Sequence, residues 1–267
     1  MSCDVVMARY PAGRGGEYPL DLPCLTHRLT AMTIVQIPVY RRWLPPLFLS
    51  LAVAACQYIT PQQPVPPTEL PELDHSNAQL YRIDPQRSVI QLKVYRDGML
   101  ARLGHNHVIR ATMVAGNVYR REDLGSSGFE FSFPVSALVI DRAEDRQRAG
   151  ADFPGEIPPA HIEGTRNNML GAELLQGDHY PTIEIRSLDM QGRLPTPTWR
   201  VAVRVRDHIS ELRVPVQIVR SGNQLTVQGA VKLSQRELGL APFCVLGGKL
   251  CVRDDIDAEF YLVAVAP

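Results

Sequence analysis

The fold is decided by the stretch Phe129-Glu130-Phe131-Ser132-Phe133-Pro134-Val135, in which an apolar side chain takes every second position. Because successive side chains of a β-strand point to opposite faces of its sheet, this alternation predicts a strand with one apolar face. The same pattern recurs at residues 90–94, 183–186, 201–205, 214–218, 225–233 and 256–264. Half-buried strands joined by turn residues indicate an antiparallel sandwich or barrel.

The strands are long and few, which favours a closed barrel over a sandwich. A sheet of about eight strands that closes on itself has no exposed edges and leaves an interior that can hold one small ligand. Residues 158–176 contain apolar side chains without a period of two, and this segment predicts one or two short helices. Residues 234–237 predict a further helical turn. We therefore expect a mainly β fold, an antiparallel barrel of about eight strands with one or two short helices.

The N-terminal part of the chain indicates export. Arg41 and Arg42 precede a short apolar run that ends in small residues directly before Cys56. This arrangement is typical of a secretory signal, and the run is shorter than the roughly 20 residues that a membrane-spanning helix needs. The stretch 53–56 resembles the lipobox of bacterial lipoproteins, in which the cysteine is acylated. An ordinary cleaved signal with a chance cysteine is the alternative.

Four parts follow from these observations. Residues 1–31 have no apolar core, and Met32 lies ten residues before Arg42, so we expect a misassigned start and a disordered segment 1–31. Residues 32–55 form the signal peptide, residues 56–79 a proline-rich extended tether, and residues 80–267 the barrel. We expect lipidation at Cys56, with the barrel on the periplasmic side of the cell envelope. Gln57 in place of aspartate favours the outer membrane.

Charge and motifs exclude several classes of function. The chain has 28 basic and 28 acidic residues and no basic stripe, which argues against a nucleic-acid partner. It has no nucleophile elbow, phosphate loop or Cys-x-x-Cys motif, so we predict no enzyme. The mixed-sign run 141–148 is interpreted as a solvated helix or loop face.

Two cysteines, Cys244 and Cys251, flank a Gly-Gly turn. A two-residue turn at Gly247 and Gly248 places the two cysteines directly opposite each other in a hairpin. A disulfide suits such a pair in an oxidising compartment. In this register, however, the two cysteines would form a hydrogen-bonded pair, whose geometry is less favourable for a disulfide. The sequence therefore leaves undecided whether the disulfide forms.

The most distinctive local pattern is Leu103-Gly104-His105-Asn106-His107-Val108. On one continuous strand the two histidines would share a face with Ile109, Ala111 and Met113, which predicts two imidazoles on the inward face. They are either buried histidines bonded to a carbonyl or carboxylate, a polar handle for a ligand headgroup such as a quinone oxygen, or metal ligands.

The metal interpretation lacks further ligands. Zinc needs a third or fourth ligand besides His105 and His107. His161, His179 and Asp141 are candidates by residue type, but no spacing in the sequence brings them close. We therefore predict no metal.

Separated segments resemble the YceI-like family, exported bacterial proteins with a lipocalin-like barrel. They are residues 81–88, residues 162–170, residues 179–187 with a Tyr-Pro before an alternating strand, and residues 236–240, where leucine replaces the usual phenylalanine. Together they span Tyr81 to about Ala266. The chain departs at 205–210, where many members carry a His-Gly-Val-Thr-like stretch. The resemblance implies binding of a long isoprenoid or similar lipid inside the barrel, without established catalysis.

The expected ligand is an apolar, polyisoprenoid or quinone-like lipid. Burial gains about 0.8 kcal/mol per methylene, or roughly 3–4 kcal/mol per isoprene unit, so a few buried units outweigh the cost of association. The predicted ligand-binding residues are His105, His107, Ile109, Met113, Phe129, Phe131 and Phe133.

The expected role is storage, shielding or transport of that lipid, with a membrane contact through the lipid anchor and no other cofactor. A homodimer is left open. The rival functions are a metal-binding protein or metal-dependent enzyme that uses His105 and His107, and a structural or interaction module with a filled barrel.

Overall fold

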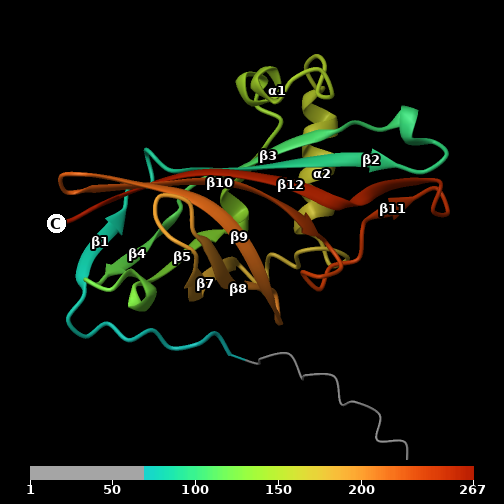
Figure 1. The fold of residues 1–267 in the computed structure, drawn as a ribbon. Helices are drawn as coiled ribbons and strands as arrows, with labels where there is room; N and C mark the ends of the chain where they lie inside the picture. The colour runs from blue at the N-terminus through green and yellow to red at the C-terminus, as the bar shows by residue number, and fades with distance from the viewer. Residues whose placement is uncertain (1–68) are drawn as a thin grey trace, which may run out of the picture. The chain divides into compact units, whose positions relative to one another are not determined.

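The computed structural model describes residues 69–267 (Figure 1). Eight antiparallel strands close into a barrel in the order β1-β4-β5-β7-β8-β9-β10-β12, and β12 pairs back with β1. They are β1 (Gln79–Ile83), β4 (Ala115–Arg120), β5 (Gly128–Pro134), β7 (Thr182–Gln191), β8 (Thr198–Val205), β9 (His208–Ser221), β10 (Gln224–Ser234) and β12 (Leu250–Val265). The predicted lipocalin-like barrel of eight strands is confirmed.

Three further strands extend the sheet beyond the barrel, and we call them the flank. They are β2 (Val89–Asp97), β3 (His107–Ala111) and β6 (Leu138–Ile140), which follow β12 in the order β12-β2-β3-β6. The flank arises because three strands of the barrel are interrupted: β1 continues into β2, β3 into β4, and β5 into β6. The interruption between β5 and β6 holds the short 3-10 helix η3 (Val135–Ala137).

Helices lie over the flank rather than over the barrel (Figure 1). Helix α1 (Ala143–Ala149) contacts β3, and helix α2 (Pro159–Leu170) contacts β6. Helix α2 begins at Pro159, where a missing N–H costs nothing, and confirms the helix predicted within 158–176. Residues 235–239 form turns instead of the predicted helical turn.

The remaining elements are short. They are η1 (Ala101–Leu103), η2 (Leu124–Ser126) and β11 (Cys244–Val245), which pairs with β12. Among the helices within residues 69–267, none has the length and apolar character needed to cross a membrane.

The segment before β1 packs on the outside of the barrel. Leu70 is buried with Ala202 and Ile209, and Arg121 pairs with Asp74 at 2.6 Å. Leu70 and Asp74, which were expected to belong to the tether, thus contact the barrel, and Leu70 finds an apolar contact on its wall. The predicted start, signal peptide and lipidated Cys56, and most of the predicted tether, lie outside the described residues.

Candidate ligand-binding cavity

The barrel encloses a cavity of about 480 Å³, which we call the barrel chamber. Alternate residues of each strand point inward, so its wall is almost wholly apolar. The predicted residues Phe129, Phe131 and Phe133 all lie in this wall. Trp199 lies there too, and its ring centroid is 5.1 Å from that of Phe129. The described residues that line this chamber include two charged side chains, Arg120 and Arg220.

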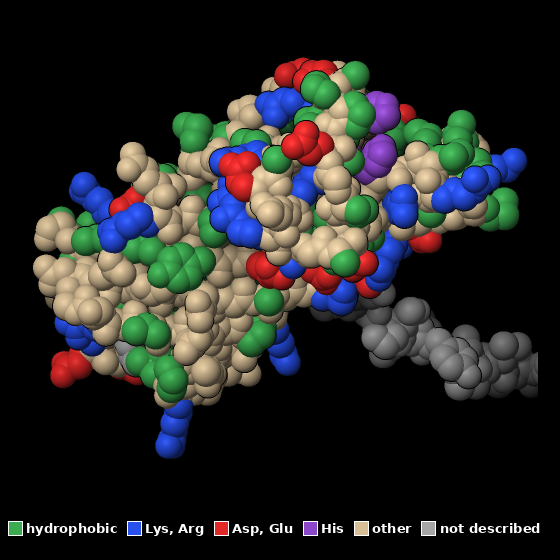
Figure 2. All heavy atoms as spheres, turned by 90° about the horizontal axis from the view of Figure 1, so that it is seen from above, with side chains coloured by type: hydrophobic (Ala, Val, Ile, Leu, Met, Phe, Trp, Pro, Cys, Tyr) green, Lys and Arg blue, Asp and Glu red, His purple; other side chains and the backbone are tan. Residues whose placement is uncertain are grey.

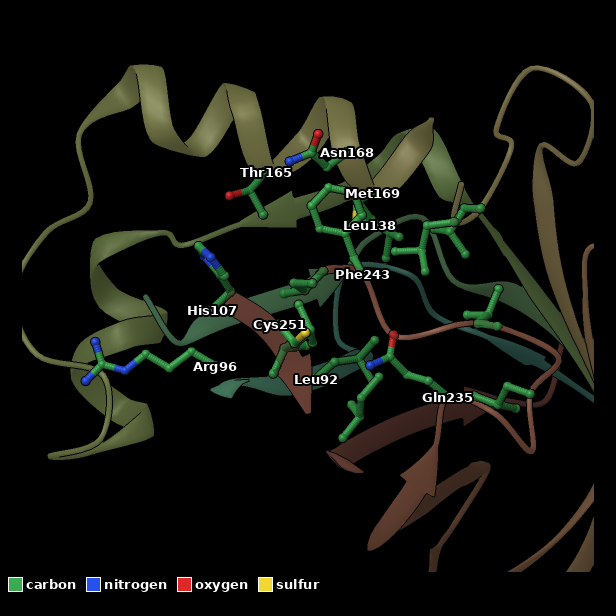
Figure 3. A pocket seen from close by; sticks show the side chains of 18 of the residues that line it. Leu92, Arg96, His107, Leu138, Thr165, Asn168, Met169, Gln235, Phe243 and Cys251 are labelled. Carbon is green, nitrogen blue, oxygen red and sulfur yellow. The ribbon is translucent and has the colours of Figure 1, made fainter. Parts of the chain in front are cut away.

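A second cavity of about 350 Å³ lies between the flank, α2 and the connection from β10 to β12, and we call it the flank chamber. Figure 3 shows Thr165, Asn168 and Met169 on the helix side and His107 and Leu92 on the strand side. The flank chamber carries most of the polar groups of the two cavities. Its polar lining residues are Arg96, His105, His107, Thr165, Asn168 and Gln235.

The two chambers adjoin each other. Their walls share Leu92, Ile183, Val205, Leu233 and Leu238, so both chambers lie against the same apolar side chains. Each volume falls within the range of known ligand pockets, roughly 300–1,000 Å³. The barrel is therefore hollow, and it adjoins a second apolar cavity whose wall differs in chemistry.

The segment 236–240, which carried part of the family resemblance, forms a turn that contributes Leu238 to the walls of both chambers. Gly239 has a left-handed φ of 76°, and a Cβ there would lie 2.6 Å from Cβ of His208. Leu238 is buried and lines both chambers, so leucine fills the position of the usual phenylalanine. Ser210 donates a hydrogen bond to the Glu237 carbonyl oxygen. The divergent segment 205–210 therefore packs against this turn.

A buried network orients His107. Its Nδ1 lies 2.6 Å from Oδ2 of Asp141, and Oδ1 of Asp141 accepts hydrogen bonds from the Val108 N–H at 2.9 Å and from Arg146 at 2.7 Å. Burial alone would raise the pKa of Asp141, but these hydrogen bonds bring the pKa below its usual value. An ionised carboxylate only accepts hydrogen bonds, so Nδ1 of His107 carries a proton. In the neutral imidazole, Nε2 is then an acceptor on a ring that lines the flank chamber.

The interpretation of the run 141–148 as a solvated helix or loop face holds for its five exposed residues but is wrong at three positions. Asp141, Asp145 and Arg146 are all buried, between α1 and the flank. Asp145 pairs with Arg110 on β3, and Arg146 donates to the Asn106 carbonyl oxygen at 2.7 Å. A mixed-sign run can be buried because each of its charges has an opposite charge and hydrogen bonds within reach.

Two of the predicted site residues, His105 and Met113, do not lie on the single continuous strand that the sequence predicted. His105 precedes β3, yet it lines the flank chamber next to His161 of α2, with His105 Nε2 3.4 Å from His161 Nδ1. Met113 is 64% exposed and lines neither chamber. The strand ends at Ala111, and Met113 has a left-handed φ of 58°, so the alternation is interrupted before it reaches Met113. The predicted Ile109 does line the flank chamber.

The environment of His105 favours its neutral form. Burial lowers the pKa of His105, and the nearby His107 and His161 lower it further. Sequence reasoning did not place His161 near the site. A signal was present, since His161, Thr165 and Asn168 have the i, i+4, i+7 spacing of one helix face.

The histidines do not form a ready metal site. No group of three or more His, Cys, Asp and Glu side chains within residues 69–267 is arranged to hold a metal ion. The ring centroids of His105 and His107 are 6.3 Å apart, and the Asp141 carboxylate already binds His107 and Arg146.

A disulfide joins Cys244 and Cys251 at the edge of the flank chamber. The predicted pairing is present, but the pair takes a non-hydrogen-bonded position, contrary to expectation. Its Cα atoms are 4.1 Å apart, and the neighbouring Val252 N–H donates to the Phe243 carbonyl oxygen at 2.9 Å. The turn has four residues, 246–249, instead of two, and this shifts the hydrogen-bonding phase by one residue pair.

An antiparallel eight-stranded barrel with an apolar interior is a lipocalin-like architecture. The structure is similar to the crystal structure of BcnA from Burkholderia cenocepacia, with a TM-score of 0.51 and 11% identity, covering 68% of this chain and 99% of that chain. This likeness shows a shared fold, and it agrees with the fold that the YceI-like resemblance implied.

Two further solved structures are similar at lower scores. One is a polyisoprenoid binding domain from Saccharophagus degradans implicated in plant cell wall breakdown, with a TM-score of 0.48, 11% identity and coverage of 70% of this chain and 98% of that chain. The other is a Campylobacter jejuni YceI protein, with a TM-score of 0.43, 7% identity and coverage of 60% and 84%. No protein-family model and no curated protein matches the chain.

Proposed function

We propose that this chain is a YceI-like protein that binds an apolar lipid of the polyisoprenoid or quinone-like class inside its barrel. The observation that carries the proposal is the pair of adjoining, mostly apolar chambers. An apolar tail in this space gains about 0.8 kcal/mol for each methylene it buries. The likeness to solved structures supports the fold alone, so the proposal depends on the cavity and on the sequence resemblance.

The polar end of the ligand lies in the flank chamber, and its tail lies in the barrel chamber. The flank chamber offers the oriented imidazole of His107 and donors at Asn168 and Arg96, which suit a hydroxyl or carbonyl headgroup. The apolar wall of the barrel chamber suits a hydrocarbon tail. A neutral headgroup is favoured because Asp141 orients His107 and the environment of His105 favours its neutral form.

The proposed role is storage, shielding or transport of this lipid from an anchored position in the cell envelope. Lipidation at Cys56 would supply the anchor on the periplasmic side, with the outer membrane as the favoured location. Several acyl chains on one cysteine would hold the protein stably, whereas a single chain binds reversibly. The mostly apolar lining of the two chambers supports a binding role rather than an enzymatic one.

Organic extraction of the purified full chain followed by mass spectrometry tests the proposal. We expect a co-purifying isoprenoid or quinone from a host that makes such lipids. Val203→Phe narrows the barrel chamber and should lose the lipid, whereas Val219→Phe is the matched control on an exposed site and should retain it. Extracts without lipid from both the unmodified chain and the control would contradict the proposal.

A further inference from the structure

Four large apolar side chains are exposed close together at the end of the molecule that holds β11. They are Met99, Leu103, Val245 and Leu246, and we call them the tip patch. Met99 is 81% exposed, Leu246 58% and Leu103 57%. Single exposed apolar residues are ordinary, but neighbouring ones mark an interaction surface.

The two loops that carry the tip patch are joined to each other. The Leu100 N–H donates to the Lys249 carbonyl oxygen at 2.8 Å. Gly98 approaches so closely that a Cβ there would lie 2.5 Å from the same oxygen. The disulfide between Cys244 and Cys251 closes the hairpin of the second loop. The two loops that carry the four side chains are therefore held next to each other.

The tip patch borders the flank chamber. Arg96 and Gly104, on either side of the first loop, line that chamber, and Val245 and Leu250, on either side of the second turn, line it too. The apolar wall of the chamber thus continues into the tip patch. An apolar molecule that enters or leaves the chamber here would pass along apolar side chains.

The two loops that carry the tip patch hold more basic than acidic residues. Residues 96–104 and 244–250 carry Arg96, Arg102 and Lys249 against one acidic residue, Asp97. The Asp97 carboxylate accepts a hydrogen bond from the Gly98 N–H at 2.7 Å. Figure 2 shows green and blue side chains gathered at this right-hand end of the molecule, beside the purple histidines.

We propose that the tip patch docks the protein on the surface of a lipid bilayer that carries anionic headgroups. Apolar side chains that enter the acyl boundary, with Lys and Arg at the headgroup level, are how interfacial elements bind membranes. The continuity with the flank chamber favours a bilayer over a protein partner, because the chamber then opens towards lipid instead of water. Docking itself needs only the tip patch. Its purpose, the transfer of lipid, rests on the proposed function.

Quenching by brominated lipids tests this proposal at the level of single side chains. Leu246→Trp places a reporter in the tip patch, and Val219→Trp places one on β9, at a position that is 51% exposed and outside the patch. Both are made in the full chain with Trp43→Phe and Cys56→Ser, so Trp199 and any contact made by the N-terminal residues are common to both. The vesicles contain phosphatidylcholine and phosphatidylglycerol with brominated acyl chains.

We expect severalfold stronger quenching of the Leu246→Trp reporter than of the Val219→Trp reporter. High salt or Lys249→Gln should weaken the quenching. Equal quenching of both reporters, or none, would overturn the proposal. Burial of the Leu246→Trp reporter with rising protein concentration in the absence of vesicles would also overturn it, because a second copy would then cover the tip patch. A protein that binds lipid in its barrel but shows no difference between reporters keeps the proposed function and loses the docking.

Discussion

The barrel chamber and the flank chamber are formed by the same run of strands but differ in what encloses them. Paired strands surround the barrel chamber on every side, and its wall is nearly all apolar. The flank chamber has strands on one side, and α2 and the connection from β10 to β12 complete it. Helix and loop residues bring polar groups there. The comparison indicates that closure of the sheet forms the apolar cavity. Interruption of the strands allows polar side chains to line the neighbouring chamber.

A physical reason underlies this division. A polar side chain inside a closed barrel has no backbone partner, because the strand N–H and C=O groups are paired with each other, and burying it unpaired costs free energy. At the flank the interrupted strands leave room for α1, whose buried Arg146 pairs with Asp141, the carboxylate that binds His107. Polar residues are therefore tolerated at the flank chamber and excluded from most of the barrel wall.

The largest expected effect is on the stability of the flank. Asp141→Ala leaves the buried Arg146 without its carboxylate partner, and breaking a buried ion pair in this way costs about 3–5 kcal/mol. Chemical denaturation of the variant should show this loss of unfolding free energy. The control Glu144→Gln, on the exposed side of α1, should change stability by no more than about 0.5 kcal/mol. Equal effects in both variants would mean that the flank does not depend on the buried pair.

A smaller loss is expected on removal of the disulfide. Cys244→Ser with Cys251→Ser opens a short loop, and the chain-entropy model predicts a loss of about 2–3 kcal/mol. Hydrogen exchange should accelerate at β11 and the adjoining end of β12, and stay slow in β7 and β8 of the barrel. Uniform acceleration throughout the sheet would show that the two chambers unfold as one unit.

Ligand affinity should distinguish the two ends of the cavity. His107→Phe removes the oriented imidazole, and loss of one hydrogen bond of about 1 kcal/mol predicts a several-fold weaker binding of a short-chain quinol. Arg220→Gln at the far end of the barrel chamber should leave that binding unchanged. Isothermal titration of both variants measures this. The opposite ranking would place the headgroup at the arginine end.

The smallest expected effect is a pH dependence of stability. Burial and the neighbouring histidines lower the pKa of His105 in the folded state below about 6.5, so the unfolded state binds more protons. The contribution of His105 is then fully present above about pH 6.5 and is lost as the pH falls through the folded pKa. His105→Asn should flatten this part of the stability profile, whereas substitution of the exposed His179 should not.

The sequence predicted the strands well because alternation is a local property. In each strand of the barrel from β5 onward, apolar side chains take every second position, as Phe129, Phe131 and Phe133 do. The site was predicted in part. His105, His107 and Ile109 reach the flank chamber, but Met113 does not, since the break between β3 and β4 interrupts the alternation.

What escaped prediction is non-local. The burial of Asp141 and Asp145 depends on His107 and Arg110, which lie more than thirty residues away and meet these carboxylates only when the segment around α1 packs on β3. The position of His161 likewise depends on where α2 lies over the flank. Whether the two cysteines form a hydrogen-bonded or a non-hydrogen-bonded pair depends on the number of residues in the turn. A Gly-Gly sequence leaves that number undecided.

The central claim is that the barrel is hollow and takes an apolar ligand, and Trp199 reports on this directly because it lies in the wall of the barrel chamber. In the full chain with Trp43→Phe, titration with a short-chain quinone should quench Trp199 fluorescence saturably. Val203→Phe should abolish the saturable quenching and Val219→Phe should preserve it. Quenching that is linear in quinone concentration and identical in all three proteins would contradict the account.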